Sequence, residues 1–309
     1  MEKITTVLEI IVPIFITIFL GMLARRKAMI SDEENKGLQQ FVMKFGLPCV
    51  LFNSCLTAEL GAESLTSMAL LLPLVLISTI WAFGARKKRF PYHNLPMMFS
   101  AQESGMLGIP LFMTLFGVEQ TYRMGVLDMT QSFIAIPVIA ILASDTGENP
   151  SSFEIIKKVF QSPLLLMSLL GLTLNLTGMI DVINSFGLGG ILTETTSFLA
   201  GPVSAVILFS VGYNFSLGEG NRKQIFTLCG VHFVMFALFG LIMQGLLFFL
   251  PAVETETRWA VLIFTTLPAS FLTPGLGRTQ EESMVASGVC SILTVVSLVI
   301  FCVITVIVA

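Results

Sequence analysis

Long apolar stretches alternate with short polar segments along almost the whole chain. A helix needs about 20 mostly apolar residues to cross the hydrocarbon core of a bilayer, and these stretches are close to that length. The pattern therefore predicts an all-α integral membrane protein with ten transmembrane helices. We place them at residues 8–24, 38–57, 65–85, 95–117, 124–144, 157–179, 194–214, 225–250, 258–277 and 283–307.

The composition agrees with this pattern. Hydrophobic residues make up 54% of the chain and charged residues only 12%, whereas soluble domains carry about 25% charged residues. The net charge of −3 provides no basic surface for nucleic acid. The five cysteines lie in apolar stretches without a CxxC pair, so we expect small buried residues and neither a metal site nor a disulfide. No cofactor is expected.

Lysine and arginine are concentrated in alternate loops, and cytoplasmic loops are the ones that carry this excess. Three basic residues fall in the loops or ends on one side: Lys3, Arg123 and Arg258. Thirteen fall on the other side: Arg25, Arg26, Lys27, Lys36, Arg86, Lys87, Lys88, Arg89, Lys157, Lys158, Arg222, Lys223 and Arg278. We therefore expect the loops after odd-numbered spans to be cytoplasmic, with both termini outside a plasma membrane.

Two halves of five spans, 1–150 and 151–309, have an odd span number each, so a repeat between them must be inverted in the membrane. Short similarities favour such a repeat. Phe45-Gly46-Leu47-Pro48 in the second span resembles Leu199-Ala200-Gly201-Pro202 in the seventh. The fourth and ninth spans both place small and polar residues before a proline.

The fourth and ninth spans are predicted to be broken helices. Pro110 in the fourth, and Pro268 and Pro274 in the ninth, each remove a backbone donor and clash with the preceding turn. Broken backbone inside a bilayer is tolerated where protein or a watery cavity satisfies it, and paired interruptions in two halves point to a transport site. The predicted substrate-binding residues are Gln102, Glu103, Ser104, Gly105, Pro110, Thr266, Pro268, Ser270 and Pro274.

Apart from charges in the first two residues of a span, three charged residues lie within the predicted spans. A lone charge costs about 2.5–3.5 kcal/mol at the bilayer centre. Glu103 is read as a group for proton coupling or substrate contact, with a structural ion pair as the alternative. Lys44 either extends its long stem to the interface or pairs with Glu103 or a substrate carboxylate. Asp128 is either interfacial or part of the wall of a polar cavity. All three are candidates for coupling or pairing.

Three segments carry a resemblance to a known family. They run from Ile11 to Phe52, from Gly105 to Leu111 (GMLGIPL) and from Leu267 to Arg278 (LPASFLTPGLGR). Together they resemble the auxin efflux carrier family and its bacterial members. The resemblance implies ten spans in two inverted repeats, with spans four and nine crossing at the substrate site. It also implies a scaffold from spans 1, 2, 6 and 7, a moving transport domain from spans 3–5 and 8–10, homodimers, and organic anions as substrates.

This chain departs from the family at the fourth span. Members commonly carry Asn just before the glycine of the crossing, where this chain reads Gln102-Glu103-Ser104-Gly105. A carboxylate at this place would repel an anionic substrate unless it is protonated or paired.

The predicted function is secondary active transport of a small organic ion, an organic anion or carboxylate, by an elevator-type movement coupled to protons or sodium. A sodium-coupled carrier similar to bile-acid symporters is the alternative, followed by a channel. The sequence contains no HExxH, GxSxG or GxxxxGK[ST], so we do not expect an intramembrane enzyme or an ATP-driven pump.

Overall fold

A computed structural model describes residues 2–58, 61–144, 163–215, 220–250 and 253–308, and this part of the chain is helical. Six of its helices are long and apolar enough to cross a membrane, or seven when the bent pair of α9 and α10 is counted as one span. The prediction of an all-α membrane protein is therefore confirmed at this level. The predicted start of the sixth span at residue 157 lies outside the described residues.

The first half begins with a long helix and then contains two segments with irregular turns. Its elements are α1 (Glu2–Arg26), α2 (Asp32–Phe41), η1 (Val42–Gly46), α3 (Leu47–Leu56), α4 (Ala62–Lys88), α5 (Leu95–Ser100), η2 (Ser104–Gly108), α6 (Ile109–Phe116), η3 (Val118–Thr121) and α7 (Tyr122–Ser144).

The second half contains one helix that the sequence pattern did not predict. Helix α10 follows α9 at an angle of 79°, in a segment that we had expected to be a loop. The described elements are α9 (Pro163–Leu176), α10 (Met179–Ser185), α11 (Gly189–Ala200), α12 (Val203–Asn214), α13 (Arg222–Phe248), α14 (Thr255–Thr266), η4 (Thr273–Leu276) and α15 (Gln280–Val308).

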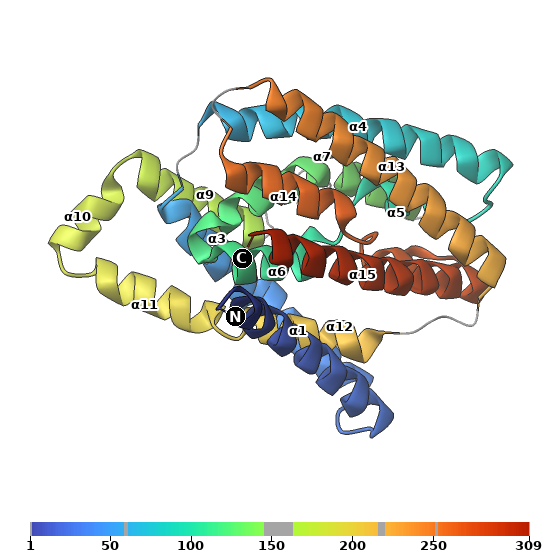
Figure 1. Ribbon diagram of the computed structural model, residues 1–309, viewed down its shortest axis with the longest axis horizontal. Helices are drawn as coiled ribbons and strands as arrows, with labels where there is room; N and C mark the ends of the chain where they lie inside the picture. The colour runs from blue at the N-terminus through green and yellow to red at the C-terminus, as the bar shows by residue number, and fades with distance from the viewer. Residues whose placement is uncertain (1, 59–60, 145–162, 216–219, 251–252, 309) are drawn as a thin grey trace.

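The helices pack as two groups (Figure 1). The first group contains α1–α3 and α9–α12, and the second contains α4–α7 and α13–α15. Glycines bring the helices of the first group close together. A Cβ added at Gly212 of α12 would lie 1.9 Å from the Ile18 carbonyl oxygen of α1, and one at Gly171 of α9 would lie 2.6 Å from the Phe52 carbonyl oxygen of α3.

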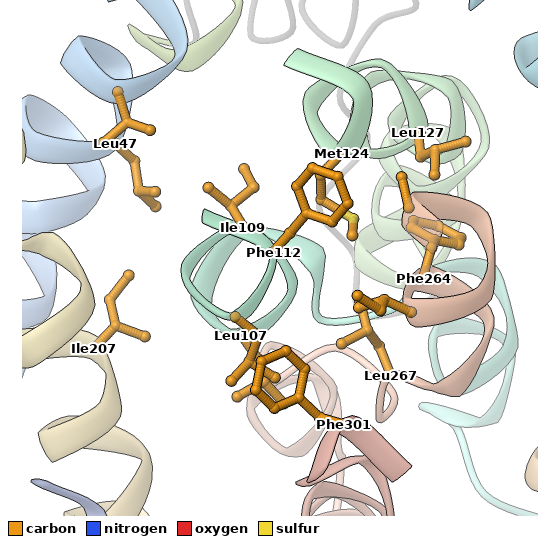
Figure 2. Packing of buried hydrophobic residues seen from close by; sticks show 14 of the residues in the cluster. Leu47, Leu107, Ile109, Phe112, Met124, Leu127, Ile207, Phe264, Leu267 and Phe301 are labelled. Carbon is orange, nitrogen blue, oxygen red and sulfur yellow. The ribbon is translucent and has the colours of Figure 1, made fainter. Parts of the chain in front are cut away.

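An apolar surface lies between the two groups. Figure 2 shows Leu47 of α3 and Ile207 of α12 on one side, facing the segment of η2 and α6 that carries Ile109 and Phe112. These side chains belong to one buried cluster that continues into both groups. Ser54 adds polar contacts between the groups, because its hydroxyl donates to the Glu119 carbonyl (3.1 Å) and accepts from the Tyr122 amide (2.5 Å).

One end of the second group is held by a buried cation. Arg123, at the start of α7, forms ion pairs with Glu63 of α4 and with Glu254, which directly precedes α14. Thr257 accepts a further hydrogen bond from Arg123 at 2.5 Å. Elements from both halves of the chain therefore meet at one guanidinium.

Proline and a wide helical turn occur together at two places. Pro48 and Pro110 each follow a π-helical segment, η1 and η2, directly. Proline has no N–H group to donate to the carbonyl of the fourth residue before it, and its ring clashes with that carbonyl. In a π turn the backbone N–H group bonds the fifth residue before it, one residue further away than in an α-helix. Accordingly, the Leu47 amide bonds Val42 and the Ile109 amide bonds Ser104. Pro110 therefore does not itself break the fourth span, and this part of the prediction is wrong.

Candidate substrate site at the crossing of two broken helices

The fourth and ninth predicted spans are both interrupted, and the interruptions contact each other. Residues 101–103 separate α5 from η2, and residues 267–272 separate α14 from η4. An antiparallel bridge joins Gln102 to Ala269. In this bridge the Glu103 amide donates to the Pro268 carbonyl (2.9 Å) and the Ser270 amide donates to the Ala101 carbonyl (3.0 Å). Each broken segment thus satisfies part of the backbone of the other, as a buried break requires.

Side chains of the neighbouring helices satisfy more of this exposed backbone. Gln131 of α7 accepts from the Gln102 amide (2.7 Å) and donates to the Gln102 carbonyl (2.9 Å). Cys290 of α15 contacts the Ala269 and Ser270 carbonyls at 3.5 Å and 3.7 Å, with sulfur as the donor. The sequence had indicated the cysteine only as a small buried residue, so its contact with the break was missed.

The Glu103 carboxylate connects the two breaks. One oxygen accepts from the Met106 amide at 3.2 Å, in the first turn of η2, and the other accepts from the Phe271 amide at 2.5 Å. The residue is only 7% exposed. A carboxylate is stabilised by such N–H donors, and a helix N-terminus adds a favourable partial charge. Each oxygen of this buried carboxylate therefore has a backbone donor.

Asp128 of α7 lies next to this network. Its carboxylate accepts a short hydrogen bond from the Ser104 hydroxyl and another from the Gln131 amide group at 3.1 Å. Both partners are neutral. Asp128 is half-buried and lies in the wall of a cavity, which is one of the two sequence alternatives for it.

This cavity has a volume of about 440 Å³ and lies between the two helix groups. The predicted residues that line it are Gln102, Glu103, Gly105, Asp128 and Ser270. Residues that we had not predicted complete the wall, above all apolar side chains of η1, α7 and α9 and the Phe271 ring. Nothing in the spacing along the chain indicates that α9 contributes to this wall, because its approach depends on the tertiary fold.

The other predicted site residues lie elsewhere. Pro274 lines a second cavity of about 470 Å³ between α15 and the first group, together with Arg25, Asp32 and Lys36. Ser104 is buried behind Asp128, and Pro268 contributes its carbonyl to the bridge. Pro110 and Thr266 line neither cavity, and Lys44 is exposed on η1 and lines neither. The two cavities share Asn214 and Phe271.

Gln102 extends from the bridge toward α13. The side-chain amide finds suitable hydrogen-bond partners when its NH₂ group donates to the Leu267 carbonyl at 2.8 Å. The amide oxygen then faces the His232 ring nitrogen, 3.4 Å away. His232 is 2% exposed and packs against Phe99 and Phe236. The break is thereby anchored on the long helix behind it.

Comparison with known proteins agrees with this architecture. The family described as "Membrane transport protein" matches residues 6–308, which is nearly the whole chain. The chain belongs to this membrane transport protein family. It is also similar to an uncharacterized transporter of Methanothermobacter thermautotrophicus, with 23% identity over 210 residues. That match covers 66% of this chain and 66% of the relative.

Membership confirms the family resemblance found in the sequence and identifies a multi-pass membrane protein of a transporter family. The exposed surface fits this environment. Large apolar side chains are highly exposed on helices of both groups, among them Phe198 (84%), Leu241 (70%) and Leu65 (70%). In water such surfaces would be a liability, whereas in a bilayer they face lipid.

Proposed function

We propose that the protein is a secondary active carrier of a small organic ion and that the crossing of its two broken segments is the substrate site. The observation that carries this proposal is the backbone bridge between Gln102 and Ala269 beside a cavity of about 440 Å³. Irregular backbone at this depth is expected where it lines a solute path, and paired broken helices are typical of substrate sites in secondary transporters.

We further propose that the chain forms ten spans in two inverted five-helix repeats, 1–150 and 151–309. Corresponding contacts in the two halves support this arrangement. Helix α1 packs on α12, the second part of the seventh span, while α9 packs on α3, the second part of the second span. In the same way α4 packs on α5 and α7, and α13 packs on α14 and α15.

Transport in this proposal follows an elevator movement of the second group against the first group, the scaffold. The apolar surface between Leu47, Ile207 and Phe112 supports such sliding (Figure 2), because non-directional contacts can be exchanged. The hydrogen bonds of Ser54 to Glu119 and Tyr122 would have to break in this movement. The carrier acts as a homodimer in the plasma membrane with both termini outside. Its coupling ion is a proton or sodium ion that acts at Glu103 and Asp128.

Uptake into proteoliposomes tests the proposal. A carrier gives saturable uptake and counterflow of a labelled substrate, whereas a channel gives ionic current that does not saturate in the same range. A panel of small organic cations and anions should be screened by solid-supported membrane currents. The absence of saturable transport across such a panel, with protein that remains folded, would contradict the proposal.

A further inference from the structure

The wall of the cavity at the crossing combines two acidic side chains with neutral polar and many apolar ones. Glu103 and Asp128 are the charged side chains among the described residues that line it. Methionine, leucine, isoleucine and phenylalanine side chains form most of the remaining wall. The second cavity differs, since Arg25 and Lys36 line it together with Asp32.

Two backbone amides at the crossing that could bind a substrate carboxylate are already occupied. Backbone N–H groups and a helix N-terminus are the usual anion ligands at broken membrane helices. Here the Met106 and Phe271 amides, one from each broken segment, donate to the two oxygens of Glu103. An anionic ligand would have to displace this tethered carboxylate before it could use them.

Asp128 accepts hydrogen bonds from two side chains. Its hydrogen-bond donors are the Ser104 hydroxyl and the Gln131 amide group, and neither carries a charge. Neither carboxylate faces a cationic side chain in the described wall of the cavity. Both oxygens of Glu103 accept from backbone amides, which leaves the half-buried Asp128 as the carboxylate more open to a ligand. A buried charge without a counter-ion is unfavourable, and a ligand of opposite charge removes that cost.

We propose that the ligand of this cavity is a monovalent organic cation, with an ammonium group at Asp128 and an apolar body against the methionine- and leucine-rich wall. This inference rests on the proposed function and names the substrate class of its site, in place of the organic anion expected from the family resemblance. The volume of about 440 Å³ lies within the range of small-molecule sites. The flexible side chains of Met43, Met97, Met106 and Met129 can adapt to apolar groups of different shape.

The test uses two probes with the same apolar part and opposite charge, phenethylammonium and 3-phenylpropionate, with neutral 2-phenylethanol as a third. Their binding to the purified full-length protein is measured by calorimetry and by the shift of the unfolding temperature. We expect phenethylammonium to bind at least about tenfold more tightly than 3-phenylpropionate, because only the cation meets an uncompensated opposite charge. Asp128→Asn should reduce this preference to about twofold or less. The matched control is Asp181→Asn on α10, where the aspartate is exposed and outside the cavity, and it should keep the wild-type preference.

A wild-type protein that binds 3-phenylpropionate as tightly as the amine, or binds neither, would overturn the cation assignment without any variant. Retention of the charge preference in a folded Asp128→Asn protein would overturn the role of Asp128. The proposed carrier function and the cation assignment can be rejected independently of each other. Saturable uptake of carboxylates without amine binding would keep the carrier and reject the cation. Amine binding without saturable uptake of any probe would keep the cation site and reject the carrier.

Discussion

The carboxylate of Glu103 accepts a 2.5 Å hydrogen bond from the backbone amide of Phe271, which lies 168 residues further along the chain. The bond joins the two broken segments on the side of the cavity, while the bridge of Gln102 and Ala269 joins them through the backbone. A side chain that holds the crossing together is therefore also part of the cavity wall. A change of its charge must affect both the ligand site and the geometry of the break.

We predict that Glu103→Gln transports substrate without dependence on a proton gradient. Glutamine keeps the shape of the side chain but cannot change charge, and its NH₂ group would face one of the two amides that now donate to the carboxylate. We also expect a loss of about 1–3 kcal/mol in the free energy of unfolding, since a buried donor is left unsatisfied. Uptake into proteoliposomes with and without a pH difference measures the first effect. A variant with full proton dependence would assign the coupling to another group, such as Asp128.

Gln131→Leu should destabilise the protein by about 1–3 kcal/mol, because the buried Gln102 amide loses its acceptor, while the Gln102 carbonyl keeps the Ser104 amide as a donor. Thermal unfolding in detergent provides the measurement. Ser132→Ala is the matched control on the next residue. Its hydroxyl bonds only the Asp128 carbonyl one turn earlier, so its removal should change stability by less than about 0.5 kcal/mol. Equal stability of the two variants would show that water or another group replaces Gln131.

Glu63→Gln should lower the unfolding free energy by about 1–3 kcal/mol, because a buried charged hydrogen bond is lost while Glu254 still pairs with Arg123. The side chains of Arg123 and Glu63 are 4% and 8% exposed. Glu119→Gln removes a carboxylate of the same kind from an exposed position and should be close to neutral. The unfolding temperatures of the two variants, compared at one detergent concentration, give the result. Similar temperatures would mean that Glu254 alone holds the cation.

Gly212→Ala should prevent the close packing of α12 on α1, since the new methyl group would lie 1.9 Å from the Ile18 carbonyl oxygen. Backbone cannot move away as a flexible side chain can, so we expect a loss of at least about 1–3 kcal/mol. Gly230→Ala on α13 serves as the control, because nothing lies within 4 Å of its added Cβ and alanine favours the helix. The yield of monodisperse protein and its unfolding temperature would reveal the difference.

The orientation expected from the thirteen-to-three distribution of basic residues can be tested by labelling. Cysteines introduced at Lys88 and Glu119, which are both exposed, should react with a membrane-impermeant maleimide from opposite sides. Position 88 should react from the cytoplasm and position 119 from outside. The native cysteines are buried or half-buried, so their background labelling should be low. Reaction of position 119 from the cytoplasm would reverse the predicted topology.

Sequence patterns predicted which two segments are interrupted. In the ninth span the predicted Pro268 lies within the interruption, whereas in the fourth span the predicted position was wrong. The small and polar residues around Glu103 and Ser270 indicated both breaks. Pro110 was expected to cause the first of them, yet the chain leaves the helix at residues 101–103 and the π turn before Pro110 accommodates the ring. The prediction relied on the proline in the sequence. The position of the break depends instead on contacts with the partner segment and with Gln131, which are both distant in the chain.

The sequence predicted the burial of Glu103 better than it predicted the hydrogen-bond partners of this residue. Glu103 was expected to contact either a substrate or an ion-pair partner such as Lys44. The structure shows two backbone amides bonded to its carboxylate, and Lys44 is exposed on η1. The role of Glu103 in coupling or substrate contact stays a prediction. Backbone amides leave no mark in a sequence, so no pattern of residue types could have indicated them. The short helix α10 was missed because its seven residues are too few for a clear helical period.

Phe271 and Asn214 line both cavities, so the partition between them is partly one aromatic ring. The backbone of Phe271 is tied to Glu103, while rotation of the ring about its side-chain bonds leaves that tie intact. The upper limit on ligand size is therefore expected to depend on the rotamer of Phe271 more than on the spacing of the helices. A compact ion would occupy one chamber, and a longer one would extend past the turned ring toward Arg25 and Lys36.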